Sequence, residues 1–390
     1  MTTSISSHQL IIVGNGFDIE CGLRSRYSDF FAPRFESIDN ITDYSETAWC
    51  ESVKEADLTV WDFILRRNTS SNWCDVEEAI RKWVQTPKTG LPINDHTIHA
   101  IAAVKRYPYA HGPIVLNGNR LPGEERDNTY VYNNIARRIW MLIDHANAES
   151  FSEEELFPIL RSELELLEKS FEEYLRNEQS SNPDYQSNSR KLFNRIACDL
   201  LPDLIHSVID TSVLTFNYTN PFTDRLVGPG LDDTNVVNIH GHLNGETIFG
   251  IDGTNCMDDD NALPFTKTYR VAMAGNQVRH SLFRSGSTGD GIQTDFVKFY
   301  GHSLGEPDYS YFQSIFDGIN LYGGRTRLVF YYRPWIVDGH PVPEHVARTD
   351  SIRKVTNLLS AYGKTLDNKD HGKNLMHKLM LEGRLQVKRI

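Results

Sequence analysis

The segment Gly14–Asp18 (GNGFD) is the first of four short segments in which small or polar residues directly follow an apolar run. Small residues at such a turn let the backbone approach a pyrophosphate, and the helix that begins there directs its N-terminus at the anion. Gly14 and Gly16 therefore predict a phosphate cradle. A tight strand-to-helix turn, with Asp18 capping the helix, explains the same residues without a ligand.

The second segment is Thr215–Thr219 (TFNYT), which lies at the end of the strand-like run Val213–Phe216. Ligands of open α/β sheets bind at the edge where strands end, and the amide of Asn217 offers a donor and an acceptor there. Asn217 is therefore a candidate ligand-binding residue. Asparagine is also common in turns, so a purely structural role is the alternative.

The third segment is Val237–His242 (VNIHGH), again at the end of an apolar run. Histidine is the side chain best matched to proton transfer near neutral pH, which makes His240 a candidate acid or base. The alternative is a histidine that only satisfies hydrogen bonds near a turn. A metal site on His240 and His242 would require a third and a fourth ligand, and the sequence offers no convincing ones.

The fourth segment is Tyr300–Gly305 (YGHSLG), which follows the run FVKFY. Its backbone amides and the hydroxyl of Ser303 suit a ribose or a phosphate. Because a doubly wound sheet brings the loops at its strand ends to one edge, the four segments together predict a shared cleft.

Apolar runs rich in β-branched and aromatic residues predict the strands that position these segments. The runs lie near residues 9–13, 213–216, 236–239, 247–249, 296–300 and 328–332. Apolar residues at helical spacing predict helices within residues 45–84, 131–147 and 153–177. The expected fold class is α/β, with a Rossmann-like, mainly parallel sheet flanked by helices and interrupted by helical insertions.

This pattern divides the chain into three predicted regions. Residues 1–44 and 205–345 form a discontinuous, Rossmann-like dinucleotide-binding core, residues 45–204 a mainly helical insertion or cap, and residues 346–390 a C-terminal helical tail. Within the insertion, residues 85–127 are rich in Pro, Gly, Asn and charged residues, and they receive no functional assignment.

Composition limits the classes of partner. The formal net charge is -12, so the summed field repels a phosphate backbone and disfavours nucleic acid as a partner. The five cysteines form no C-x-x-C pair, which argues against a zinc ribbon and a disulfide framework. The apolar run Leu10–Val13 is too short for a signal peptide or a membrane span. We expect a cytoplasmic protein with no membrane partner.

Five stretches in order, LIIVGNGFDIECGL, NWCDVEEAI, LTFNYTNPF, VNIHGHL and FYGHSLGEPDYSYFQSIF, resemble the AbiH family of phage abortive-infection proteins. The resemblance runs from about Leu10 to Phe316. It implies anti-phage defence with a phage-derived trigger, and it is compatible with a homo-oligomer. Trp73, Asp75 and Glu77 of the second stretch belong either to the site or to a helix N-terminus whose dipole favours acidic residues.

Through AbiH, the chain is also remotely similar to the sirtuin fold. The sirtuin pattern G-A-G-x-S-x-x-x-G-I is matched by Gly14–Leu23, T-Q-N-I-D by Thr215–Thr219, H-G by His240–Gly241 and G-T-S-L by Gly301–Leu304. This similarity implies NAD as the substrate. The dinucleotide-binding positions that it implies are Gly14, Asn15, Gly16, Phe17, Thr215, Gly301 and Ser303. The catalytic positions are His240 as the base, Asn217 beside the nicotinamide ribose, and Asp18.

The chain departs from the sirtuin pattern in three ways. Asp18 stands where serine is usual, no G-I-P-D-F-R segment follows Leu23, and the four-cysteine zinc module is absent. Removal of an acyl group from a peptide is therefore disfavoured, and water is the expected acceptor. Asp29, in the pair Asp29–Phe30, is a candidate for a further carboxylate of the pocket.

The function expected from this resemblance is hydrolysis of the nicotinamide glycosidic bond of NAD, without a metal, through an oxocarbenium-like state. The choice between NAD and NADP stays open. The alternative is a non-catalytic nucleotide-binding sensor that signals to a defence partner, and nicotinamide release separates the two. A nuclease is disfavoured because the sequence offers neither a metal–carboxylate cluster nor a basic groove.

Overall fold

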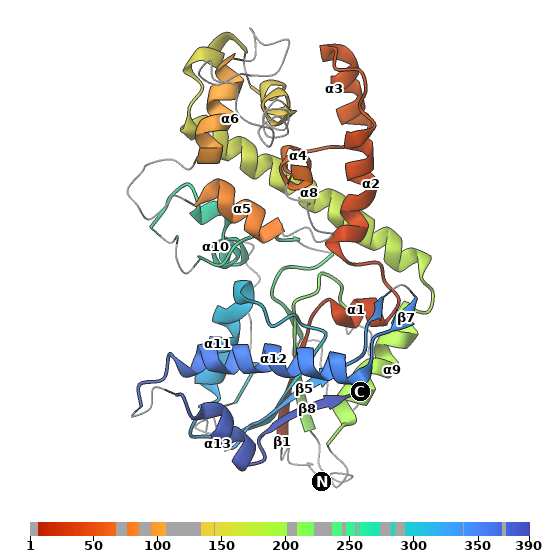
Figure 1. Ribbon diagram of the computed structural model, residues 1–390, viewed down its shortest axis with the longest axis vertical. Helices are drawn as coiled ribbons and strands as arrows, with labels where there is room; N and C mark the ends of the chain where they lie inside the picture. The colour runs from red at the N-terminus through yellow and green to blue at the C-terminus, as the bar shows by residue number, and fades with distance from the viewer. Residues whose placement is uncertain are drawn as a thin grey trace, which may run out of the picture. The chain divides into compact units, whose positions relative to one another are not determined.

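The structure is a computed structural model in which the chain forms two compact units (Figure 1). It describes residues 7–67, 76–85, 95–106, 134–143, 145–200, 209–221, 236–243, 247–253, 256, 258–273, 282–284, 293–337, 339–368 and 372–390. The sheet unit consists of Met1–Ser25, Asn177–Glu246 and Gly275–Ile390, and the helical unit consists of Arg26–Arg176 and Thr247–Ala274.

A six-stranded sheet forms the centre of the sheet unit, and all its neighbouring strands are parallel. In spatial order the strands are β3 (Val236–Asn238), β2 (Ile209–Thr215), β1 (Ser7–Val13), β4 (Thr294–Tyr300), β5 (Arg327–Tyr332) and β8 (Leu385–Arg389). The predicted α/β class and five of the predicted strands are confirmed. The predicted strand at residues 247–249 is wrong, because these residues lie in the helical unit without regular structure.

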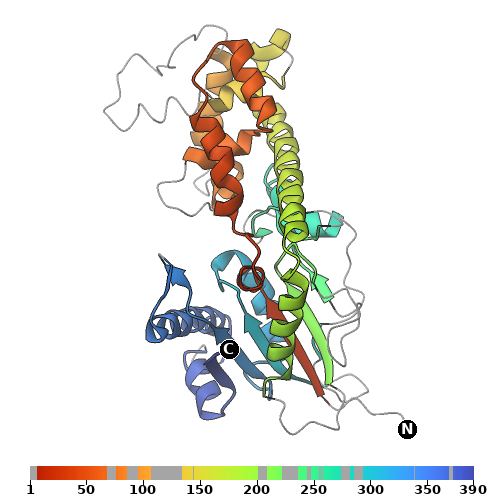
Figure 2. The same ribbon diagram turned by 90° about the vertical axis from the view of Figure 1, so that its right-hand side faces the viewer.

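Helices cover both faces of this sheet, which is why β1 is buried along its whole length and ends in the apolar run Leu10–Val13 (Figure 2). The helices of the sheet unit are α1 (Gly16–Glu20), α9 (Tyr185–Cys198), α11 (Tyr309–Gly318), α12 (Glu344–Gly363) and α13 (Leu375–Leu381). Successive side chains of a strand point to opposite faces. Leu10 and Ile12 accordingly join the core with α11, α12 and α13, whereas Ile11 and Val13 join the core with α1 and α9.

The strand order creates a topological switch point between β1 and β4. The chain proceeds from β1 to β2 and β3 on one side, and then returns past β1 to β4 on the other side. Open α/β sheets bind ligands in the crevice at such a point, outside the carboxyl ends of the strands. The strand order therefore predicts a ligand site at the loops after β1 and β4.

Buried ion pairs connect the helices within the helical unit. Its helices are α2 (Tyr27–Asp39), α3 (Glu46–Glu55), α4 (Val60–Arg67), α5 (Val76–Val84), α6 (Asp95–Arg106), most of α8 (Glu153–Ser181) and α10 (Lys267–Met273). The carboxylate of Asp62 accepts two hydrogen bonds from Arg34, at 2.6 and 2.7 Å. Glu163 accepts two from Arg138, each 2.8 Å, and a third from the backbone N–H of Val60. These fully paired carboxylates fix the ends and crossings of the helices.

The predicted division of the chain differs from the two units in four places. Helix α9, predicted in the insertion, belongs to the sheet unit, and α10, predicted in the core, belongs to the helical unit. Residues 27–39, predicted in the core, form α2, which contacts α4 of the helical unit. Residues 346–390, predicted as a helical tail, contain most of α12 and all of α13, but they end in β8, a strand of the sheet. The predicted helix at 153–177 is confirmed as α8, whereas in the segment predicted at 131–147 the described α-helical residues are 134–140.

Two further predictions concern the part of the chain outside the sheet. Trp73 and Asp75 lie outside the described residues, and Glu77 lies on α5, 2.6 Å from the buried ammonium of Lys267 on α10. Asp29 lies at the start of α2, where its carboxylate accepts the backbone N–H of Arg26 at 3.3 Å. Among the described residues, no helix is both long and apolar enough to cross a membrane.

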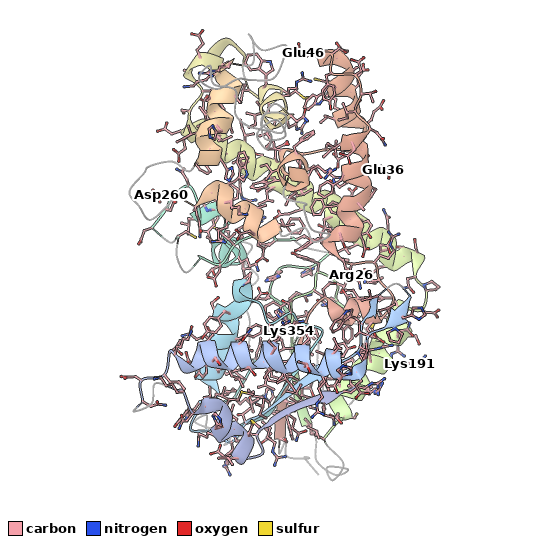
Figure 3. All side chains as sticks on the ribbon, in the orientation of Figure 1. Arg26, Glu36, Glu46, Lys191, Asp260 and Lys354 are labelled. Carbon is pink, nitrogen blue, oxygen red and sulfur yellow. The ribbon has the colours of Figure 1, made fainter. Side chains whose placement is uncertain are left out.

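Most charged side chains are exposed, as is usual for globular proteins. Figure 3 labels six such exposed residues, which are Arg26, Glu36, Glu46, Lys191, Asp260 and Lys354. The informative acidic groups of the sheet unit are therefore the buried ones. Asp18 is 2% exposed and Asp308 is 9% exposed, and both follow strands that flank the switch point.

Candidate active site at the carboxyl edge of the sheet

The four segments singled out in the sequence begin in one row across the sheet. Val13 pairs with Thr215 on one side and with Tyr300 on the other, and Thr215 pairs in turn with Asn238. Residues 14, 216, 239 and 301 therefore leave the sheet at the same edge. The parallel register is what brings these distant parts of the sequence together.

The glycines after β1 and β4 allow the two loops to touch. The backbone N–H of Gly14 donates to the carbonyl of Tyr300 at 3.0 Å, and that of Gly16 donates to the carbonyl of Gly301 at 2.8 Å. A Cβ on Gly16 would lie 2.7 Å from the Cα of Gly301, and Gly301 itself has a φ of +70°. These glycines are thus required by loop packing, and these two N–H groups already have acceptors.

Asn15 and Phe17 stabilise the same turn. The side-chain amide of Asn15 donates to the carbonyl of Ser25 at 3.0 Å and accepts the Ser25 hydroxyl at 2.5 Å. Phe17 is fully buried, with its ring edge-on to Tyr300 at a centroid distance of 6.1 Å. The contacts of both side chains are therefore within the protein.

Asp18 is a buried carboxyl at the centre of a hydrogen-bonded group. Its two oxygens accept the hydroxyls of Tyr185 at 2.8 Å and Thr219 at 2.6 Å, and the Asn217 amide also bonds to it. Burial raises the pKa of Asp18 to about 6, because desolvation of the carboxylate outweighs the hydrogen bonds that lower it. Asp18 can thus change its charge close to neutral pH.

The side chain of Asn217 bonds to Asp18. Its backbone N–H donates to the hydroxyl of the buried Thr215 at 3.1 Å, and its carbonyl accepts the Asn238 amide at 3.1 Å. The side chain is 4% exposed, and its Oδ1 has no hydrogen-bond partner among the described residues. A buried acceptor of this kind suits the hydroxyl of a ligand.

His240 belongs to a second group, formed with Asp308 and His302. Nε2 of His240 lies 3.3 Å from Oδ1 of Asp308, and Nε2 of His302 lies 3.3 Å from Oδ2 of the same carboxylate. Nδ1 of His302 accepts the backbone N–H of Leu304 at 2.9 Å, so a neutral His302 carries its proton on Nε2. The approach of Nε2 of His240 to Asp308 lacks hydrogen-bond geometry, so it does not fix the tautomer of His240.

The segment TFNYT separates the two groups. The rings of Phe216 and Tyr218 face His240, at centroid distances of 5.4 and 6.3 Å, whereas Asn217 and Thr219 bond to Asp18. Asn217 and Tyr218 form a bend after β2, so these alternating contacts are those of a bend. The sequence predicts a single constellation of Asp18, Asn217 and His240, but the structure brings only the first two into contact, and His240 approaches Asp308 instead.

A comparison with protein families identifies the chain at this point. The model of the family described as bacteriophage abortive infection AbiH matches residues 10–332, which include all four segments of the site. The chain belongs to the AbiH family. The protein is therefore a member of a family of phage abortive-infection proteins. No curated protein and no solved structure matches it.

The loop after β4 contributes Gly301 and Ser303 to the edge in this AbiH protein. Ser303 is exposed, and its hydroxyl accepts the backbone N–H of Gly305 at 3.3 Å, which leaves the hydroxyl hydrogen for donation. Leu304 has a φ of +57°, a strained conformation for a branched residue, and its bond to His302 holds it there. The loop is thus fixed in a conformation that displays Ser303.

Four AbiH residues of these groups were absent from the sequence prediction, namely Tyr185, Thr219, His302 and Asp308. His302 and Asp308 lie in the stretch YGHSLGEPD. A second histidine at a strand end, followed six residues later by a carboxyl, was a signal that could have identified both residues. Tyr185 gives no signal of this kind, because it comes from α9, distant in sequence from each strand end.

Proposed function

We propose that this AbiH protein hydrolyses the nicotinamide glycosidic bond of NAD, and that the resulting loss of NAD is the means of abortive infection. The observation that carries the proposal is the contact between His240 and Asp308 at the ligand-binding edge of the sheet. A histidine with a buried carboxylate 3.3 Å from its Nε2, at the carboxyl edge of a parallel sheet, is a suitable general base for a nucleotide substrate. The order of motifs shared with the sirtuin pattern supports NAD as that nucleotide.

In this reaction, water attacks C1′ of the nicotinamide ribose and the C1′–N bond breaks. Neutral nicotinamide leaves with the electron pair of that bond. Nδ1 of His240 accepts a proton from the attacking water, and Asp308 stabilises the imidazolium through Nε2. The aromatic side chains of Phe216 and Tyr218 beside His240 limit access of bulk water to the base.

The residues around Asp18 fit the ribose better than the pyrophosphate. Oδ1 of Asn217 is a buried acceptor suited to a ribose hydroxyl, and the exposed hydroxyl of Ser303 can donate to a ribose or phosphate oxygen. The N–H groups of Gly14 and Gly16 already donate to carbonyls of the neighbouring loop. The dinucleotide phosphates therefore need donors other than these two amides.

The alternation of TFNYT favours a second candidate function, a non-catalytic nucleotide switch. Asn217 bonds to Asp18, and its neighbours Phe216 and Tyr218 contact His240, so a ligand that shifts the segment at one group also shifts it at the other. Such a coupling would transmit binding without cleavage. The hydrolase would release nicotinamide from NAD, whereas the switch would bind NAD without releasing it.

The test is nicotinamide release from NAD and from NADP by the purified protein, followed by chromatography. We expect release by the wild type, loss in His240→Ala, and retention in the matched control His242→Ala, whose side chain is half-buried two residues along. In cells, expression with a suitable phage trigger should lower NAD. Growth arrest with unchanged NAD would contradict the proposal, and binding of NAD without release would favour the switch.

A further inference from the structure

Three arginines line one pocket of the sheet unit that has no part in the site described above. The pocket has a volume of about 450 Å³ and is lined by Arg195, Arg333, Arg389 and Ile390. We propose that this arginine pocket binds a phosphate or pyrophosphate group. The proposal does not depend on cleavage of NAD.

The fold assembles the arginine pocket from three distant segments. Arg195 lies on α9, Arg333 directly follows β5, and Arg389 is the last residue of β8. Tyr332 pairs with Arg389 in the sheet, so Arg333 and Arg389 leave adjacent parallel strands at the same carboxyl edge. Ligands of open α/β sheets bind at this edge.

Composition does not account for this clustering. The chain has 40 basic and 52 acidic residues, so a surface drawn from its average composition would be acidic. Arg333 and Arg389 each have a carboxylate partner, and Arg195 brings a third guanidinium to the same pocket, so an anion there would balance its charge. A guanidinium also presents its N–H groups as a planar fork that matches two oxygens of a phosphate.

The existing partners of these arginines leave room for such an anion. Arg333 pairs with Glu20, and Arg389 pairs with Glu344 at 2.8 Å. The side chains of both arginines are more than half exposed, at 52% and 55%, and ion pairs at such surface positions contribute little to stability. Among the described residues, Arg195 has no hydrogen-bonded acceptor. A phosphate can therefore bind Arg195 and compete for the other two.

The probe for this pocket is inorganic pyrophosphate, with binding measured by calorimetry on the intact protein. We expect the wild type to bind it, and the double variant Arg195→Ala/Arg389→Ala to bind at least about tenfold more weakly, since hydrogen bonds to charged groups contribute strongly. Higher salt should weaken the wild-type binding. The matched control is Arg353→Ala, which removes an exposed arginine of α12 that pairs with Asp350 outside the pocket.

Competition between pyrophosphate and NAD identifies the source of the phosphate. If NAD displaces pyrophosphate and also binds the double variant more weakly, the arginine pocket holds the pyrophosphate of the dinucleotide. If NAD neither competes nor responds to the substitutions, the pocket takes a separate phosphate ligand. Absence of pyrophosphate binding by the wild type would overturn the proposal. Equal binding by the double variant, the Arg353→Ala control and the wild type, with unchanged circular dichroism, would overturn it as well.

Discussion

The carboxylate of Asp308 lies between two imidazoles, with Oδ1 3.3 Å from Nε2 of His240 and Oδ2 3.3 Å from Nε2 of His302. His302 has its other nitrogen occupied by the backbone N–H of Leu304, so it can serve only as a donor to Asp308 when neutral. His240 is therefore the histidine of this pair suited to gain and lose a proton. In the proposed reaction, Asp308 would act through His240, as a positioning residue.

Asp308→Asn should lower the rate of nicotinamide release by roughly 100- to 10,000-fold. The asparagine side chain has nearly the same shape as the aspartate, but its amide nitrogen would face one imidazole N–H. The negative charge that stabilises the imidazolium would also be lost. The fall should appear in kcat more than in KM, together with a change in the ¹⁵N shifts of His240. Asp350→Asn, on the outer helix α12, is the control that should retain the wild-type rate.

The pKa of Asp18 should make stability depend on pH in a defined window. Its pKa is raised from 3.8 to about 6 by burial, so the folded protein holds this proton more tightly than the unfolded chain. The stabilisation from protonated Asp18 is complete below about pH 4 and is lost as the pH rises through about 6, by roughly 2–3 kcal/mol at most. Denaturant unfolding of the wild type and Asp18→Asn at several pH values measures the difference.

The variant Tyr185→Phe checks the cause of this pH dependence. It removes one hydroxyl that donates to the Asp18 carboxylate, at 2.8 Å, and the loss weakens the ionised form more than the protonated form. Its destabilisation should thus be greater above the window than below it. Equal destabilisation at every pH would show that Asp18 does not titrate in this range.

Gly301→Ala should destabilise the protein more than the matched control Gly383→Ala. Both glycines have a positive φ, of +70° and +65°, so both alanines carry the same backbone strain. A Cβ on Gly301 would lie 2.5 Å from the backbone nitrogen of Phe17, whereas one on Gly383 meets nothing within 4 Å. We expect an additional loss of roughly 1–3 kcal/mol for Gly301→Ala, measured by denaturant unfolding. Equal losses would mean that the loops after β1 and β4 can move apart to admit the methyl group with little loss in the free energy of unfolding.

The sheet was predictable from sequence because its strands carry their own signal. Val213 and Val297, for example, lie in buried apolar runs that end in polar or small residues, the pattern of a strand covered on both faces. The run at residues 247–249 has the same appearance. There, however, the backbone of Phe249 bonds to Glu168 and Arg270 instead of a neighbouring strand, and one chain segment cannot reveal such distant partners.

Two other features were not predictable for related reasons. Strand β8 has only Leu385 and Val387 as apolar residues and is partly buried, so its sequence resembles the polar tail around it. The contact of Asp308 with His240 depends on the conformation of the loop after β4, which residue spacing does not encode. Sequence patterns locate the edge at which the site forms, but the grouping of its side chains depends on the direction in which each loop turns.

The separation of Asn217 from His240 leads to a test of whether the two act in one site. Asn217 bonds to Asp18, whereas His240 approaches Asp308. If both contribute to one reaction, Asn217→Ala and His240→Ala should each abolish nicotinamide release while the circular dichroism stays unchanged.

The double variant then distinguishes one site from two. Groups that act as a unit are strongly non-additive, so the double variant should be no slower than His240→Ala alone. If the two substitutions lower the rate independently, their effects multiply, and the segment carries two separate functions. His242→Ala should keep most of the activity, because His240 is the residue that approaches Asp308, and a turn at residues 239–240 with Gly241 at a φ of +82° separates the two histidines. An inactive His242→Ala beside an active His240→Ala would remove His240 as the base and, with it, the proposed mechanism.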